Sequence, residues 1–338
     1  MKKLLLGLLA ASLLAMQVVA DVLQLKPGHP QEYVVQKGDT LWDISGRFLD
    51  KPWLWPALWD VNPQIENPHL IYPGDRLYLV YVDGQPRLRR DSGIVKLSPA
   101  MRSTPIDEAI PAIPLEDINA FLTRSRVVMP GELESAPYVL SGADQHVITG
   151  AGDNLFARGA FPDGERRFVI FRSGEMYIDP VTQEALGQQA LEIGRGKLLT
   201  TEGEIASISV QSANEEIRQA DRLLPALEQR VMASFYPAPP ERDLEGLILA
   251  VEGGVTQIGY LDIVALNLGE REGVLEGNVF AIKKAAERVR DPVTAEMVEL
   301  PGARAGLLMV FRTFEKMSYA IVLSANRPLK VADKVVVP

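Results

Sequence analysis

Hydrophobic and polar positions follow three different patterns along this chain of 338 residues. The first is one unbroken apolar run over residues 4–15. The second is the helical spacing of Leu41, Ile44 and Phe48, which recur at i, i+3 and i+7 and so share one helix face. The third, from about residue 137 onward, is a series of short apolar runs separated by Gly, Asp-Pro and Asn turn signals. We therefore expect an α+β protein with a leader, a small mixed module and a larger antiparallel β region.

The apolar run is typical of a secretory signal peptide. It follows the basic start Met1–Lys3 and precedes Val18 and Ala20, which stand at the −3 and −1 positions of a cleavage site. The run is shorter than the roughly 20 residues that a bilayer-spanning helix needs. We predict that residues 1–20 are cleaved after Ala20 and that the mature chain works outside the cytoplasm; an uncleaved anchor is the alternative.

Composition removes several classes of function. Lys and Arg number 35 against 44 Asp and Glu, for a net charge of −9, and this balance disfavours binding to nucleic acid or to an anionic membrane. The chain has no Cys and only three His, which excludes disulfides and thiolate metal sites and leaves little room for histidine-based catalysis. We therefore expect no cofactor, no metal, no catalytic residue and no nucleic-acid partner.

Segment 32–82 has the pattern strand, helix, helix, strand. Thr40 can cap the first helix, with Asp43 three residues later in the position of a capping box. A second short helix is expected from Trp55, with Pro56 in its first turn. An alternating apolar run then closes the segment as a strand.

The residues of this segment resemble the LysM domain. The resemblance rests on the strings YVVQKGDTLWDI at 33–44, NP at 62–63 and IYPGDRL at 71–77. It implies a βααβ fold that binds the N-acetylglucosamine-containing glycan of peptidoglycan or chitin. It also implies glycan contacts in two loops, namely Gly38, Asp39, Thr40 and Leu41 in the first and Asn62, Leu70, Ile71 and Pro73 in the second.

All four tryptophans of the chain lie in this module: Trp42, Trp53, Trp55 and Trp59. Sugar C–H faces pack well on aromatic rings, but a module of about 50 residues also needs bulky side chains to form a core. We expect core positions for two or three of the rings. Trp53 lies on a long inter-helix segment and is the candidate for an exposed aromatic platform.

Residues 83–136 are rich in proline and are predicted to form a connecting segment with one short helix. Pro114 marks the start of that helix, Ile118 lies on its apolar face and Arg126 lies near its end.

The rest of the chain contains an internal repeat. Asp179–Thr182 recurs as Asp291–Thr294, and Ser212–Asn214 recurs as Ser324–Asn326, both displaced by 112 positions. We predict two β repeats, at 137–225 and 245–338, joined by a linker at 226–244 and folded as small antiparallel barrels or sandwiches. The Asp-Pro strings indicate tight turns rather than catalytic carboxylates.

The order of the strings along the mature chain resembles the TsaP family, the secretin-associated proteins of type IV pili, whose C-terminal region is similar to that of the flagellar protein FlgT. The strings are AIPAIP at 109–114, APYV at 136–139, GDNLFARG at 152–159 and VALNLG at 264–269. The resemblance implies a periplasmic, cell-wall-associated protein that anchors an outer-membrane secretin to peptidoglycan. A ring-forming homo-oligomer around the secretin is one arrangement that it implies.

Two other functions stay open on the sequence. LysM modules also occur on cell-wall hydrolases and on hydrolase activators, although no pair of carboxylates here suggests glycoside hydrolysis. A wall-binding protein unrelated to pili is the third alternative.

Overall fold

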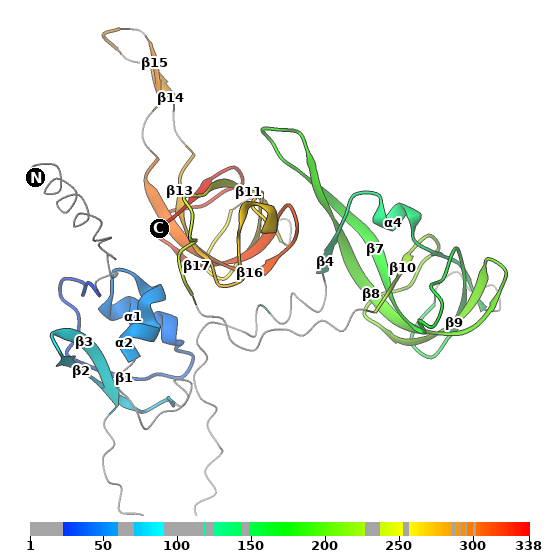
Figure 1. The fold of residues 1–338 in the computed structure, drawn as a ribbon, viewed down its shortest axis with the longest axis horizontal. Helices are drawn as coiled ribbons and strands as arrows, with labels where there is room; N and C mark the ends of the chain where they lie inside the picture. The colour runs from blue at the N-terminus through cyan, green and yellow to red at the C-terminus, as the bar shows by residue number, and fades with distance from the viewer. Residues whose placement is uncertain are drawn as a thin grey trace, which may run out of the picture. The chain divides into compact units, whose positions relative to one another are not determined.

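The computed structural model divides into two compact units, residues 1–110 and 111–338, and each is described by itself (Figure 1). The predicted leader lies outside the described residues. Among the described residues, no helix has both the length and the apolar character needed to cross a membrane. The structure describes residues 23–59, 71–90, 118, 125–143, 149–226, 237–252, 257–285, 288–290, 292–294, 296–299 and 302–338.

Unit 1 packs short helices against a small antiparallel sheet. The helical elements are α1 (Leu41–Phe48), η1 (Pro52–Leu54) and α2 (Trp55–Trp59), and the strands β1 (Glu32–Val34), β2 (Arg76–Val82) and β3 (Gln85–Arg90) adjoin in that order. The predicted capping box is confirmed, since Thr40 and Asp43 satisfy each other's backbone N–H groups. The predicted apolar face of α1 is fully buried.

The sheet of unit 1 extends beyond the predicted end of the module at residue 82. Strand β3 pairs with β2 from Leu77↔Arg90 to Val82↔Gln85, whereas the sequence placed this segment in the connecting region. The two strands are joined by Asp83 (φ 49°) and Gly84 (φ 77°). Positive φ at both central residues is the geometry of the tight hairpin turn that Asp-Gly favours.

Residues 125–225 form the first of two barrels. Its elements are β4 (Ser125–Val128), α4 (Glu132–Ser135), β5 (Tyr138–Gly142), β6 (Asn154–Arg158), β7 (Arg167–Ile178), β8 (Ala185–Glu202), β9 (Ile205–Ala213) and β10 (Arg222–Pro225). The strand order is β4-β8-β7-β10-β5-β6-β9, and because β8 also pairs with β9, all strands except β4 close into a ring, called barrel 1 below.

The elements before residue 137 differ from the predicted connecting segment. Strand β4 pairs with β8, with Arg126 opposite Ala190, so Arg126 lies in a strand and not at the end of a helix. Of the predicted helix, most residues lie outside the described ones; Ile118 is helical and fully buried.

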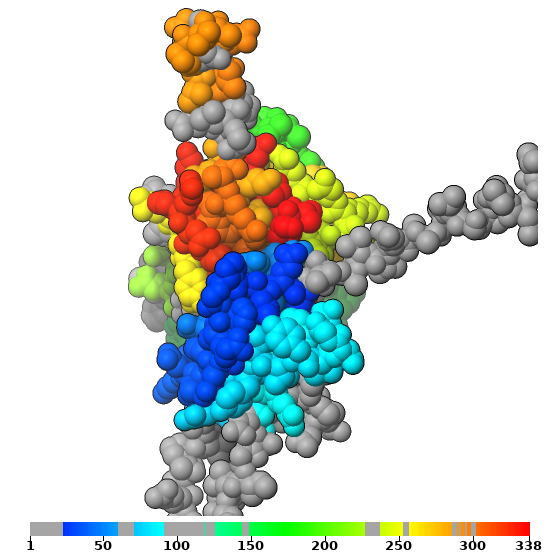
Figure 2. All heavy atoms as spheres, turned by 90° about the vertical axis from the view of Figure 1, so that its left-hand side faces the viewer, coloured from blue at the N-terminus to red at the C-terminus, as the bar shows by residue number. Residues whose placement is uncertain are grey.

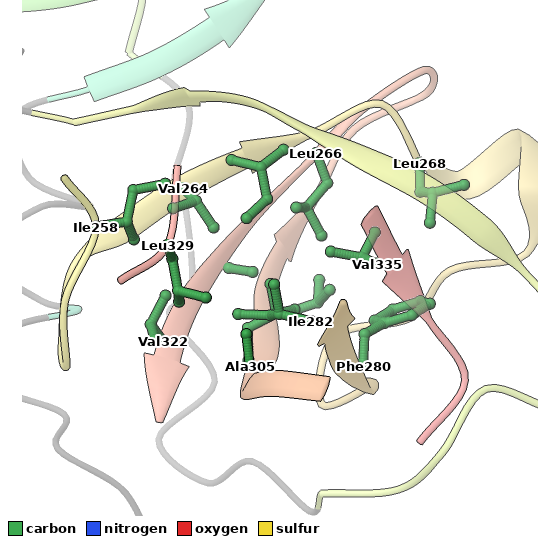
Figure 3. Packing of buried hydrophobic residues seen from close by; sticks show 14 of the residues in the cluster. Ile258, Val264, Leu266, Leu268, Phe280, Ile282, Ala305, Val322, Leu329 and Val335 are labelled. Atoms are coloured by element: carbon green, nitrogen blue, oxygen red, sulfur yellow. The ribbon is translucent and has the colours of Figure 1, made fainter. Parts of the chain in front are cut away.

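Residues 245–338 form barrel 2, a closed barrel with the order β11-β12-β17-β16-β13-β18. Its elements are β11 (Glu245–Val251), β12 (Ile263–Leu266), η3 (Glu270–Glu272), β13 (Val279–Lys283), β16 (Arg304–Thr313), β17 (Ser318–Ala325) and β18 (Lys334–Val336). Inward-facing side chains such as Val264, Phe280 and Val322 come from different strands and point toward one another (Figure 3). Strands β14 (Arg288–Arg290) and β15 (Met297–Glu299) form a separate hairpin, which is seen as a projection in orange (Figure 2).

The two barrels agree in strand order and in local hydrogen bonds. Around each ring, the strands adjoin in the sequence first, second, fifth, fourth, third and sixth, counting β5 and β11 as first. Before the last strand, Ala220 (φ 69°) and Ala332 (φ 70°) both have positive φ. In the same turns, the amide of Arg218 donates to Asp221 Oδ2 over 2.8 Å and the amide of Lys330 donates to Asp333 Oδ2 over 2.9 Å. These positions differ by the 112 residues found in the sequence.

Candidate functional site

Two turns of unit 1 lie beside each other at the end of β1. One follows Val35 and leads into α1, and the other, Tyr72–Asp75, leads into β2. The amide of Val35 donates to the carbonyl of Asp75 over 2.9 Å, and the amide of Gly74 donates to the carbonyl of Val35 over 2.8 Å. The fold therefore brings together the described parts of the two loops in which the sequence placed glycan contacts.

The side chain of Asp39 stabilises the first turn. Its Oδ2 accepts hydrogen bonds from the hydroxyl of Tyr33 and from the amide of Gln36, both over 2.8 Å. Burial, together with the hydrogen bond to the Asp39 carboxylate, raises the pKa of Tyr33 to about 12. Gly38, with φ of 93°, lies exposed at the tip, where a side chain would be strained.

The two residues after Asp39 have structural roles. The Thr40 hydroxyl donates to Asp43 Oδ2 over 2.7 Å and accepts from the Asp43 amide over 3.1 Å. Its side chain is 5% exposed, and Leu41 is fully buried in the core. Any contact that these two residues make with a ligand would therefore involve backbone atoms rather than side chains.

The second turn likewise combines a buried side chain with accessible residues. Ile71 is fully buried, whereas Pro73 is half-buried and Gly74 is exposed. The carboxylate of Asp75 accepts from the amide of Tyr72 over 3.0 Å and so closes the turn. Asn62 and Leu70, the other predicted contacts, lie outside the described residues.

The predicted exposed ring at Trp53 is wrong. Its side chain is only 2% exposed, and the other three tryptophans are also buried. Residues Pro52–Leu54 form a tight 3-10 turn instead of an open loop, and this turn directs the ring into the core. Lys51 Nζ lies 6.0 Å from the centre of the Trp53 ring. All four rings therefore form part of the core of this small module.

Comparison with known proteins identifies the family that part of unit 1 resembles. Residues 33–80 match the LysM domain. The chain is also 40% identical over 58 residues to the "Uncharacterized protein YqbP" of Bacillus subtilis (strain 168), a match that spans 14% of this chain and 26% of that relative. LysM domains bind the N-acetylglucosamine-containing glycan of peptidoglycan, and LysM is a binding domain rather than a catalytic one.

A group of polar contacts that the sequence did not predict joins the two barrels. The tip of the β7–β8 hairpin carries Tyr177, whose hydroxyl donates to Glu252 Oε1 over 3.0 Å and lies 3.1 Å from the hydroxyl of Tyr319. Gln189 Nε2 donates to both oxygens of Glu252 over 2.9 and 3.0 Å. Burial raises the pKa of Glu252 above its ordinary value. The hydrogen bonds from Tyr177 and Gln189 offset only part of this rise.

The turn at the end of this hairpin is polar. Asp179 Oδ1 accepts from the amides of Val181 and Thr182 over 2.8 and 2.9 Å, as its Asp-Pro sequence predicts. Its Oδ2 accepts from Asn267 Nδ2 over 2.8 Å. Burial raises the pKa of Asp179, but these hydrogen bonds outweigh it and the net pKa is lowered.

Proposed function

We propose that this chain is a non-catalytic periplasmic protein that binds peptidoglycan through residues 33–80 and anchors an outer-membrane secretin of the type IV pilus kind through its barrels. The match of these residues to the LysM domain carries the first half of the proposal. The second half rests on the resemblance of the longer sequence to the TsaP family.

The glycan site is proposed at the two adjoining turns. Gly38 and Gly74 offer exposed backbone there, and Pro73 offers an apolar surface. Acetamide and hydroxyl groups of N-acetylglucosamine can hydrogen-bond to such backbone, and its apolar faces can pack on the proline ring. Asn62 and Leu70 belong to the same proposed site by the resemblance.

Sedimentation of the full chain with purified peptidoglycan sacculi tests this site. We expect Pro73→Glu to weaken binding about tenfold, an effect of about 1.4 kcal/mol, because a charge would replace the apolar contact. The matched control is Pro56→Glu, the same change at an exposed first-turn position of α2, where an acid suits the helix dipole. Equal binding by both variants and the unmodified chain would contradict the proposed site.

The barrels are proposed to be two copies of one unit that provide the protein-binding part. Their shared strand order and the shared turn at Asp221 and Asp333 support this. A ring of chains around the secretin belongs to the same proposal. The immobilised chain should retain the secretin, identified by immunoblot, from solubilised outer membranes, and failure to retain it would remove the pilus role without affecting wall binding.

The absence of catalysis is tested separately. Sacculi incubated with the chain should release no soluble muropeptides beyond the buffer control. Turnover in this assay would favour the hydrolase alternative instead.

A further inference from the structure

Barrel 2 has an open pocket between the end of β13 and the loop before β18. Three of its lining residues are cationic, and the exposed Pro328 lies beside them. The lining residues are Gln257, Lys284, Arg327, Pro328, Leu329 and Lys330. Such a concentration of positive charge is unexpected in a chain with a net charge of −9.

One of the three cations is committed to the fold. Lys284 Nζ lies 2.7 Å from Asp333 Oδ2 and also donates to the carbonyl of Pro328 over 2.9 Å. Asp333 is fully buried, so this pair anchors the floor of the pocket. Arg327 and Lys330 are exposed, and neither forms an ion pair with a residue that the structure describes.

At the corresponding positions of barrel 1, the cationic side chains have acidic partners that the pocket of barrel 2 lacks. Arg172 replaces Lys284 there and lies 3.0 Å from Asp221, the counterpart of Asp333. Arg172 also pairs with Glu215 over 3.0 Å, and Arg218 lies 3.7 Å from Glu216. At the positions of those two glutamates, barrel 2 has Arg327 and Pro328.

The two regions therefore have the same turn and the same buried aspartate but opposite net charge. In barrel 1, two arginines face three carboxylates, all of them within the chain. In barrel 2, three cations and one carboxylate, that of Asp333, occupy the corresponding positions among the residues that the structure describes. Closely spaced cations with one internal counter-charge attract an external anion, and an arginine guanidinium can bind an oxyanion with two parallel hydrogen bonds.

We propose that this pocket of barrel 2 binds an oxyanion group, a carboxylate or a phosphate, on an acidic ligand. Arg327 and Lys330 contact the anion, Lys284 supplies charge from the floor, and the exposed Pro328 packs against the carbon skeleton next to it. The site is separate from the proposed glycan site, which lies in the other unit of the chain.

Isothermal titration of the full chain at low ionic strength tests the proposal, with citrate as the carboxylate probe and pyrophosphate as the phosphate probe. We expect saturable binding of at least one probe at one site per chain, weakened by added salt because the contacts are exposed. The probe that binds more tightly identifies the source of the oxyanion. Absence of binding by both probes would overturn the proposal.

Charge reversal localises the site. Arg327→Glu restores the glutamate that barrel 1 has at this position and should weaken binding at least tenfold; Lys330→Gln should weaken it less. The matched control is Arg218→Glu, the same charge change at the barrel 1 counterpart of Lys330, which should leave binding unchanged. Arg327, Lys330 and Arg218 are all exposed, so the variants should fold, and unchanged thermal unfolding confirms it. An equal loss in Arg327→Glu and Arg218→Glu would overturn the proposal, because it would indicate diffuse attraction.

Discussion

Three outward-facing positions on β8 and β9 of barrel 1 differ in polarity and burial from the corresponding positions of barrel 2, although the strands of the two barrels adjoin in the same order. On barrel 1, Arg195 and Lys197 of β8 are exposed and Ser207 of β9 is half-buried. The corresponding residues of barrel 2 are Leu307, Met309 and Tyr319, all of which are buried. Strand β8 thus alternates at this point, whereas β16 is buried at every position from Ala305 to Phe311. The inner alternation and the turns define the barrel, while the outer face determines what it packs against.

The hairpins of the two barrels differ in the same way. The tip of β7–β8 contacts barrel 2 through Asp179 and through Glu184, which lies 3.0 Å from Arg271 and 2.7 Å from Lys316. On the β14–β15 hairpin, Val293 is 90% exposed and Met297 is 63% exposed. The same type of hairpin therefore contacts the neighbouring barrel in one repeat and is exposed in the other. The β7–β8 hairpin is called the clamping hairpin below.

The largest expected effect comes from removing a buried aromatic side chain from the outer side of barrel 2. Tyr319→Ala removes a fully buried ring that stacks on Phe311 at 6.5 Å and meets Phe314 edge-on at 5.6 Å. We expect a loss of about 3 to 4 kcal/mol in the free energy of unfolding, measured by urea denaturation.

Ser207→Ala is the matched control at the corresponding place on barrel 1. Because Ser207 has a small side chain and is only half-buried, its replacement should change stability by less than about 0.5 kcal/mol. Similar losses in the two variants would mean that the outer faces are equivalent in energy despite their different composition.

The second prediction compares the buried aspartates of the shared turn. Asp333→Ala should cost about 3 kcal/mol, because Lys284 loses its carboxylate and the amides of Ala285 and Lys330 lose an acceptor. Asp221→Ala should cost less, about 2 kcal/mol, because Arg172 keeps Glu215 and the carbonyl of Glu216. Thermal unfolding of both variants gives the order, and the reverse order would show that the second acid of barrel 1 does not compensate.

Local chemistry explains which parts of the fold the sequence predicted. The capping box at Thr40, the buried face of α1 and the strand at Ile263–Leu266 follow from signals within a few residues. The hairpin at Asp83-Gly84 carried such a signal too, but the prolines around it favoured a connecting segment instead. The tight turn that the Asp-Pro sequence predicts at Asp179 is confirmed by the hydrogen bonds from the amides of Val181 and Thr182.

Contacts between distant residues explain what the sequence missed. Tyr177 and Glu252 are 75 positions apart, and no local periodicity links them. Trp53 was misplaced because the 3-10 turn that buries it depends on the surrounding core. At the candidate site, the sequence predicted both turns and the buried helix face that includes Leu41, but it also placed Leu41 among the glycan contacts. The burial of Ile71 was not predicted. Backbone atoms and Pro73 are therefore the accessible part of the described turns.

The smallest expected effect concerns the charge of the clamping hairpin. Hydrogen bonds and charge attraction from Lys316 and Arg271 lower the pKa of Glu184 below its ordinary value of 4.5. An acid whose pKa is lowered in the folded state contributes stability that is present above its unfolded pKa and is lost as the pH falls through the folded value. Glu184→Gln should therefore lose less stability than the unmodified chain when the pH falls below about 4.5.

The corresponding acid of the other hairpin provides the control for this pH effect. Glu296 is exposed and forms no ion pair with the described residues, so Glu296→Gln should reproduce the acid limb of the unmodified chain. Both variants retain Glu252 and Asp179, so the titration of those groups cancels when the two are compared. Thermal unfolding across a series of pH values measures the difference, and identical acid limbs in the two variants would show that the Glu184 ion pairs contribute nothing to the clamp.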